Sequence, residues 1–280
     1  MAGDWVVVIP SYNRVDTLKE KTLKLLKDHK IPASKIYVFV ANEEQKKLYE
    51  EGLEKGSVGH IVVGVKGLAE VRNFIFKYFP KGKKLVEMDD DIRGFFEYDE
   101  KVHRHEKPLV SLEKVIERGF EECHKSGARL WGVYPIPNGF FMKPTVTTDL
   151  KFIIGSFWGC INPGEDKALQ LPFGGEKEDY QRTILFWEAD GVVVRLNFVA
   201  PKTAYYKEPG GMQEGDRLGK QDKAVKEMMK RWPQYIKPNP RRKSGYPEIR
   251  LVQPKEGAAV APATAAAAKR TTRKKKRVNN

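Results

Sequence analysis

Residues 84–91 read KLVEMDDD, a short apolar run that ends in three consecutive aspartates. The run at 84–88 predicts a buried strand, because a brief, mostly apolar segment with a β-branched residue suits the interior of a sheet. Open α/β sheets bind ligands at the carboxyl ends of their strands. The triplet Asp89-Asp90-Asp91 is therefore expected at such an edge, so this stretch suggests both a fold and a place for a site.

The segments before this strand alternate in the same manner. Apolar runs predict strands, and amphipathic or charged stretches predict the helices between them. The expected strands are 5–9, 35–40 and 60–64, and the expected helices are 16–29, 43–55 and 68–79. This order predicts an α/β fold: a single Rossmann-like domain with a mostly parallel central sheet flanked by helices on both faces.

The second half of the chain has a less regular pattern. We expect a loop over the sheet edge at 93–108, strands at 130–134, 139–142, 151–157 and 192–196, helices at 111–125, 176–189 and 220–232, and a mobile loop at 204–219. Residues 257–280 are Ala-rich and then Lys/Arg-rich, which is typical of a disordered tail. The domain is accordingly expected to occupy residues 1–256.

Composition narrows the class of protein. Apolar residues make up 40% of the chain and charged residues 31%, which favours a packed core over disorder. Two cysteines provide no disulfide framework, and no apolar run approaches the roughly 20 residues that cross a bilayer. The first residues also lack the pattern of a secretory signal. These features predict a cytoplasmic protein without a membrane span.

The net charge of +14 invites a nucleic-acid-binding hypothesis, but seven of the excess basic residues lie in the tail at 257–280. The aspartate triplet points elsewhere. Three adjacent carboxylates repel one another, and they make sense around a hard divalent cation, which prefers oxygen ligands. Such a cation can bridge two phosphates and neutralise a diphosphate leaving group. The alternative is a solvated acidic turn.

Two more segments point to phosphate or nucleotide binding. The first strand ends in Pro10-Ser11-Tyr12-Asn13-Arg14, where a base and ribose can lie beside Tyr12 and the planar fork of Arg14 can meet phosphate. A simple strand-to-helix turn is the alternative. The stretch 67–73, GLAEVRN, begins a predicted helix whose N-terminus favours anions, and Arg72 adds a donor there. Arg72 can equally be a surface residue.

Together these three segments resemble the GT-A glycosyltransferases, over about residues 4–200. The resemblance implies a nucleotide-binding first loop, with Asp89 and Asp91 as the aspartates of a metal-binding Asp-x-Asp motif and Asp90 beside the donor. The combination of 10–14, Val71-Arg72-Asn73 and 88–91 is similar to the viral and phage branch, which includes the TET/JBP-associated glycosyltransferases. Length and tail resemble the chlorella-virus β-xylosyltransferases that act on a capsid-protein N-glycan, which implies the host cytoplasm.

The family also presents its catalytic base in an acidic motif, which the stretch 174–180, GGEKEDY, resembles. Glu178 and Asp179 are its acids, and we expect Asp179 to take the proton of the attacking sugar hydroxyl, with inversion at the donor carbon. These acids can instead stabilise a helix N-terminus. Lys207 and the Pro209-Gly210-Gly211 loop can close over the diphosphate, although any flexible loop has this composition.

Two positions leave alternatives open. Many family members add a late His as third metal ligand, but all five His precede residue 125, so that role is empty or filled by water or another acid. His103 and His105 follow the triplet and are expected to be solvent-exposed rather than ligands. Trp158 is either a platform on which an acceptor sugar stacks or part of the core.

The sequence thus predicts a metal-dependent inverting glycosyltransferase with Mn²⁺ or Mg²⁺ and a UDP-sugar donor. The resemblance implies xylose from UDP-xylose and a glycan hydroxyl on a viral glycoprotein as acceptor. One alternative is glucosylation of hydroxymethylated pyrimidines in DNA. Another is a non-catalytic nucleic-acid-binding protein, which leaves the aspartates unexplained because they repel phosphate. A P-loop phosphoryl-transfer enzyme lacks its Gly-x-x-x-x-Gly-Lys-[Ser/Thr] motif.

Overall fold

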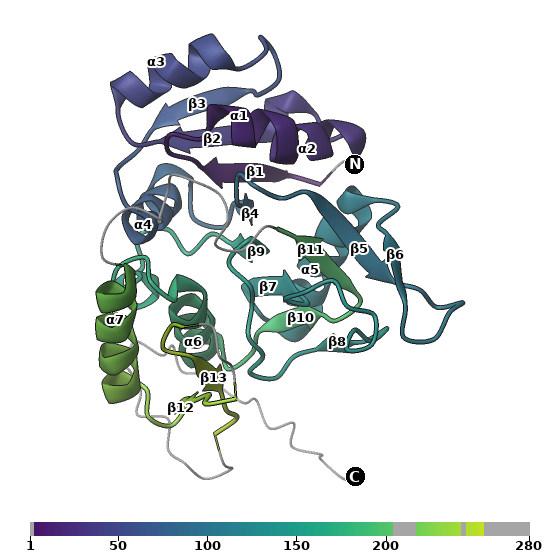
Figure 1. Ribbon diagram of the computed structural model, residues 1–280, viewed down its shortest axis with the longest axis vertical. Coiled ribbons are helices and arrows are strands. Elements are labelled where there is room, and N and C mark those ends of the chain that lie inside the picture. The colour runs from purple at the N-terminus through teal and green to yellow at the C-terminus, as the bar shows by residue number, and fades with distance from the viewer. Residues whose placement is uncertain (1–2, 204–216, 242–244, 255–280) are drawn as a thin grey trace, which may run out of the picture.

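The computed structural model describes residues 3–203, 217–241 and 245–254. Its centre is an eight-stranded sheet with the order β3-β2-β1-β4-β9-β7-β10-β8 (Figure 1). The strands are β1 Trp5–Pro10, β2 Ile36–Val40, β3 His60–Val63, β4 Lys84–Met88, β7 Leu130–Val133, β8 Val146–Thr147, β9 Phe157–Ile161 and β10 Val194–Leu196. Strands β1 to β4 are mutually parallel, as are β7 and β10, whereas β9 and β8 run antiparallel to their neighbours. The predicted mostly parallel α/β fold is confirmed.

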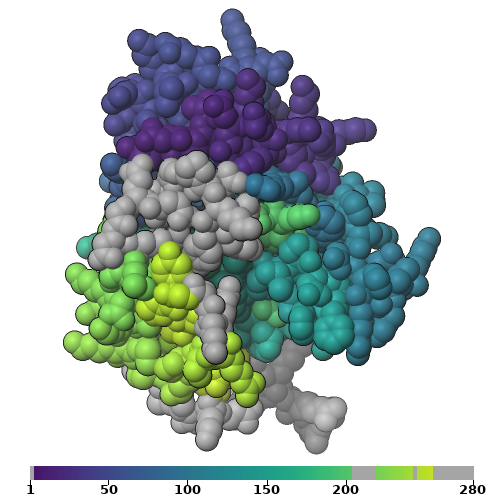
Figure 2. Space-filling model, in the orientation of Figure 1, coloured from purple at the N-terminus to yellow at the C-terminus, as the bar shows by residue number. Residues whose placement is uncertain are grey.

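Helices cover both faces of this sheet. They are α1 Val15–Leu18, a π-helical turn Lys19–Leu23, α2 Lys24–Asp28, α3 Glu43–Gly52, α4 Leu68–Tyr78, α5 Leu112–Ser126, α6 Glu178–Asp190 and α7 Arg217–Arg231, with 3₁₀ turns at Ala33–Lys35 and Lys167–Leu169. Among the described residues, none of these helices has the length and apolar character to span a bilayer. Figure 2 shows the N-terminal elements at one end of the molecule and α7 with the C-terminal strands at the other.

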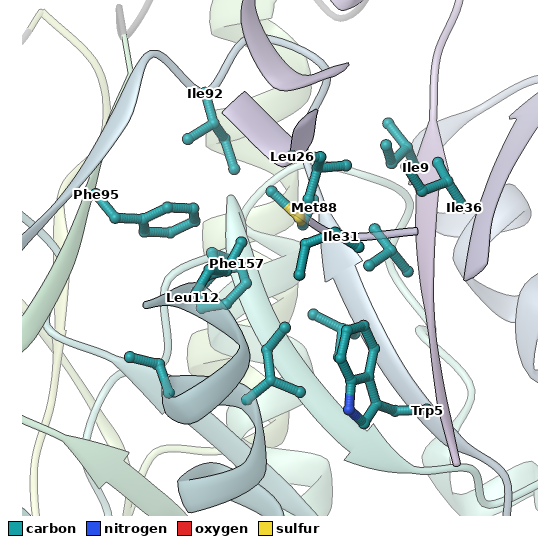
Figure 3. Close-up of a cluster of buried hydrophobic side chains, with 14 of the residues drawn as sticks. Trp5, Ile9, Leu26, Ile31, Ile36, Met88, Ile92, Phe95, Leu112 and Phe157 are labelled. Atoms are coloured by element: carbon teal, nitrogen blue, oxygen red, sulfur yellow. The ribbon is translucent and has the colours of Figure 1, made fainter. Parts of the chain in front are cut away.

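The side-chain alternation of β1 divides the core into two layers. Trp5, Val7 and Ile9 face the layer covered by α1, α2 and α5 (Figure 3), while Val6 and Val8 face the layer covered by α4, α6 and α7. Each fully buried aliphatic or aromatic side chain contributes about 1.5–3 kcal/mol. A strand buried on both faces must be apolar at every position, which explains the unbroken run at 5–9.

Close packing in the first layer depends on two glycines. The ring of Trp131 on β7 lies against Gly119 of α5 and Gly159 of β9. A Cβ atom at Gly119 would come within 2.3 Å of the ring, and one at Gly159 within 2.4 Å. Only glycine permits this approach between α5 and the middle of the sheet.

The loop predicted at 93–108 is wrong. This segment contains two strands, β5 Gly94–Tyr98 and β6 Glu106–Pro108. With β11 Val199–Lys202 they form a three-stranded antiparallel sheet. Charged residues interrupt the apolar alternation here, and β5 pairs with a strand about a hundred positions later. Such long-range pairing leaves no local signature in the sequence.

Other strand predictions also need correction. The strand predicted at 139–142 is a turn, held by the Phe141 N–H donating to the Asn138 carbonyl at 3.0 Å. The strand predicted at 151–157 begins only at Phe157, and the irregular segment before it enters the site described below. A C-terminal hairpin, β12 Ile236–Pro238 with β13 Ile249–Leu251, was not predicted. The predicted loop at 204–219 lies largely outside the described residues, as does the tail.

Candidate active site

The sheet has a topological switch point at β1. The chain runs from β1 outward to β2 and β3, then returns to β4 on the other side of β1, so the loops after β1 and β4 open side by side at one edge. A cavity of about 1160 Å³ lies there, lined also by the starts of α4 and α6 and by one side of α7. The predicted site residues that line it are Pro10, Ser11, Tyr12, Arg14, Arg72, Asp89, Asp90, Asp91, Glu178 and Asp179. Lys207 lies outside the described residues.

Asp90 ties the first loop to the aspartate triplet. Its Oδ2 accepts a hydrogen bond from Ser11 Oγ at 2.6 Å, and its Oδ1 accepts one from Arg14 Nη1 at 3.1 Å. The Tyr49 hydroxyl lies 2.6 Å from Ser11 Oγ and accepts the Arg14 backbone N–H at 3.1 Å. Asp90 is buried, and both carboxylate oxygens bond within the protein. The sequence carried no signal for Tyr49, which reaches the loop from α3.

Asp89 and Asp91 flank this anchor. The Asp89 side chain is 38% exposed and lies 3.2 Å from Arg72 Nη2, while Asp91 lies 3.8 Å from Arg14 Nη1. Partial desolvation at the base of the cavity raises the pKa of Asp89; Arg72 opposes the shift, and the charges of Asp91 and Asp90 add to it. Clustered oxygen ligands with excess negative charge fit a hard divalent cation.

Arg72 is buried beneath the triplet, so the surface alternative is wrong: its side chain is 2% exposed. Its Nη1 pairs with Glu87 Oε2 at 2.6 Å, and its Nη2 donates to the Gly155 carbonyl at 3.1 Å and lies 3.5 Å from Glu178 Oε1. Burial lowers the pKa of Arg72, but Glu178, Glu87 and Asp89 together outweigh it and raise the pKa. Arg72 thus connects β4 to the start of α6.

A second arginine, Arg182, holds the other end of Glu178. Its Nη1 donates to Glu178 Oε2, and its guanidinium stacks 3.8 Å from the ring centre of Trp158. Trp158 is fully buried, so the prediction of an acceptor platform is wrong and the core alternative is confirmed. The sequence did offer a signal for Arg182, because residues four apart on a helix lie on the same face.

Asp179 is the carboxylate at the start of α6 that remains less enclosed. Lys177, the residue just before α6, adopts a left-handed conformation with φ of 54°, which turns the chain into the helix. Burial and the charge of Glu178 raise the pKa of Asp179 to about 6, while Arg182 opposes the shift. A carboxylate with this pKa is suited to accept a proton near neutral pH.

The metal-binding hypothesis can be tested against the residues present. Within the described parts of the chain, no three His, Cys, Asp or Glu side chains form a group that could hold a metal. No His lines the cavity, and His103 and His105 are exposed as expected. Asp89 and Asp91 therefore supply two carboxylates, a set typical of Mg²⁺ or Mn²⁺ sites in which substrate phosphates and waters complete the coordination.

No protein-family model matches the chain, and no curated protein matches its sequence. Several solved structures are distantly similar to this chain. TarS from S. aureus is 11% identical, with 71% of this chain and 60% of that one covered and a TM-score of 0.47. The mannosyltransferase PcManGT from Pyrobaculum calidifontis, in complex with GDP-Man and Mn²⁺, is 12% identical, with 74% and 58% covered and a TM-score of 0.47. The chain thus spans about three fifths of these two proteins. At this distance the likeness says nothing about what the chain binds.

Proposed function

We propose that the chain is a metal-dependent glycosyltransferase that transfers a sugar from a nucleotide-sugar donor to a hydroxyl group with inversion. One observation carries the proposal: Asp89 and Asp91 at the end of β4 and Asp179 at the start of α6 line the same cavity, at the switch point of the sheet. The resemblance of the first loop, the 71–73 segment and the triplet to GT-A glycosyltransferases supports it.

The residues divide the work of the reaction. Tyr12 and Lys66, whose Nζ lies 5.0 Å from the centre of the Tyr12 ring, line the cavity where the nucleoside would bind, and Arg14 lines it where the diphosphate would bind. Asp89 and Asp91 would hold a divalent cation, which would supply positive charge to neutralise the departing diphosphate. Arg72 and Glu178 are positioning residues. Their side chains pair with each other, and Arg72 also pairs with Asp89.

Asp179 serves as the general base. Its carboxylate accepts the proton of the acceptor hydroxyl while that oxygen attacks the anomeric carbon and the bond from this carbon to the diphosphate breaks. Attack from the face opposite the leaving group converts an α-linked donor into a β-linked product. Glu178 is less suited to this role, because both of its oxygens pair with arginines.

The finer identity of the substrates follows from the resemblance alone. It favours UDP-xylose as donor, a glycan on a viral glycoprotein as acceptor and a host cytoplasm as the compartment.

A donor panel tests the proposal. The protein is incubated with Mn²⁺ and UDP-xylose, UDP-glucose, UDP-galactose or GDP-mannose, and release of the nucleoside diphosphate is followed. We expect hydrolysis of one donor, its loss in Asp91→Asn and its retention in the control Asp99→Asn. Absence of both hydrolysis and Mn²⁺-dependent nucleotide binding would overturn the proposal. Hydroxymethylated duplex DNA and an oligosaccharide then compete as acceptors.

A further inference from the structure

A second, smaller cavity adjoins the active-site cavity. Its volume is about 320 Å³, near the lower end of the range for small-ligand sites. Phe152 and Tyr180 line both cavities, and their rings pack in a tilted arrangement with centres 4.4 Å apart. The Tyr180 hydroxyl donates to the Ile249 carbonyl of β13 at 3.0 Å, which joins the C-terminal hairpin to this wall; Figure 1 shows β13 beside α6.

The charged side chains that line the second cavity all carry the same sign. They are Lys151, Arg195 and Arg250, and the described lining contains no carboxylate. Two amides, Asn239 and Gln253, add hydrogen-bonding capacity, and apolar residues complete the wall. A hollow with this composition attracts an anion.

Arg195 makes the case specific. It lies on β10, half-buried, with Nε donating to Asn197 Oδ1 at 2.8 Å and Nη1 donating to the Phe152 carbonyl at 3.3 Å. No carboxylate of the described residues forms an ion pair with Arg195. The nearby Asp149 instead pairs with Lys151 at 2.9 Å. Burial lowers the pKa of Arg195, and Tyr134 and Asp149 only partly offset it.

A guanidinium removed from water without a counter-charge is unfavourable, and buried cations are normally paired. The planar fork of arginine matches the oxygens of phosphate and carboxylate. We infer that the second cavity binds an oxyanion, a phosphate or carboxylate group, carried by the acceptor whose hydroxyl reacts in the adjoining cavity. The assignment to the acceptor rests on the proposed function, whereas oxyanion binding does not.

Binding of inorganic phosphate to the full chain tests the site. Titration calorimetry at constant ionic strength compares the wild type with Arg195→Gln, Arg250→Ala and a matched variant of the main cavity, Lys66→Ala. We expect Arg195→Gln and Arg250→Ala to weaken phosphate binding at least about tenfold, because each removes hydrogen bonds between charged groups. Lys66→Ala should bind phosphate like the wild type.

The opposite pattern, with loss only in Lys66→Ala, would place phosphate in the main cavity and overturn the inference. Unchanged phosphate binding in both arginine variants would also overturn the inference. Arg195 would then serve only to hold the Phe152 carbonyl by a hydrogen bond. If Arg195→Gln does not fold, as judged by its unfolding midpoint, the exposed Arg250→Ala decides the question alone.

Two further arms identify the source of the oxyanion. Acetate in place of phosphate separates carboxylate from phosphate preference. In a transfer assay, the bound oxyanion should raise the KM for the acceptor and leave that for the donor unchanged; a rise only in the donor KM would overturn the acceptor assignment. Should no donor be turned over, the proposed function fails while the calorimetric result still decides oxyanion binding.

Discussion

The three aspartates after β4 differ in their partners, and this difference defines the site at the scale of single residues. Asp90 bonds to Ser11 and Arg14, while Asp89 and Asp91 flank it at the cavity. The sequence predicted the position of the triplet, because a strand pattern runs directly into it. It did not predict which member is the anchor, since Ser11 and Arg14 lie 79 and 76 positions before Asp90 and no local pattern joins them.

The pKa of Asp179 predicts the pH dependence of transfer. A base must be deprotonated to accept a proton. With a pKa of about 6, Asp179 is mostly deprotonated above pH 6, and its activity as a base is lost as pH falls through that value. We expect kcat/KM to drop about tenfold per pH unit below 6, and Asp179→Asn to lose about 10²–10⁴-fold. Steady-state kinetics from pH 4.5 to 8 measures both.

Glu227→Gln is the matched control for this profile, because Glu227 lines the same cavity from α7. Its acidic limb should match that of the wild type. An acidic limb that persists in the residual activity of Asp179→Asn would assign the base to another group.

Arg72 predicts a large effect on stability. Arg72→Met leaves the fully buried Glu87 without its partner, and breaking a buried pair from one side costs about 3–5 kcal/mol. Arg118→Met, on the exposed face of α5, should change the free energy of unfolding by less than about 1 kcal/mol. Urea unfolding compares the two variants.

The double variant Arg72→Met/Glu87→Gln checks the cause. It should recover part of the loss, because the uncompensated charge is gone. Equal stabilities for Arg72→Met and Arg118→Met would show that the buried network contributes nothing to folding.

At the scale of elements, the helix predicted at 16–29 contains a feature that the sequence does not reveal. A π-helical turn at Lys19–Leu23 interrupts it and brings Thr22 Oγ1 to 2.8 Å from the Asp89 carbonyl and 3.0 Å from the Ile92 N–H. Such turns are frequent at functional sites. They insert one residue into a helical turn without demanding a particular residue type, so apolar periodicity does not predict them.

Thr22 therefore predicts a contrast between two similar substitutions. Thr22→Val keeps the shape but leaves the Asp89 carbonyl and the Ile92 N–H unpaired, which costs about 1–3 kcal/mol. Thr22→Ser keeps both hydrogen bonds and should stay closer to the wild type. Thermal unfolding of the three proteins measures the difference, and a larger loss in Thr22→Ser than in Thr22→Val would indicate that the methyl contacts matter instead of the hydrogen bonds.

At the scale of the whole molecule, the cavity is built from residues spread over most of the chain. The β1–β4 half was predictable because its strands and helices alternate regularly. The α7 wall and the second cavity were not, because Gln221 of α7 and Arg195 of β10 line cavities whose other walls come from segments far away in sequence. Hydrophobic periodicity predicts which face of a helix or strand is buried, but it does not predict which other element packs against that face.

This architecture predicts linked binding of nucleotide and metal. UDP with Mn²⁺ should raise the melting temperature, because a ligand at 100 times its Kd adds about 2.7 kcal/mol of stability. For a chain of this size that is a shift of several degrees. Removal of the metal with EDTA, or Asp91→Asn, should abolish most of the shift. A UDP-induced shift that is equal with and without EDTA would exclude metal-linked binding.

The tilted ring pair of Phe152 and Tyr180 has a consequence for the size of an acceptor. These two rings form a wall shared by the two cavities, so an acceptor that binds its oxyanion in one cavity and reacts in the other must extend past them. We therefore expect an oligomeric acceptor, with its negative group and its reacting hydroxyl on different units. Transfer should then depend on the spacing between these two groups along the acceptor, and fragments too short to span both cavities should react poorly.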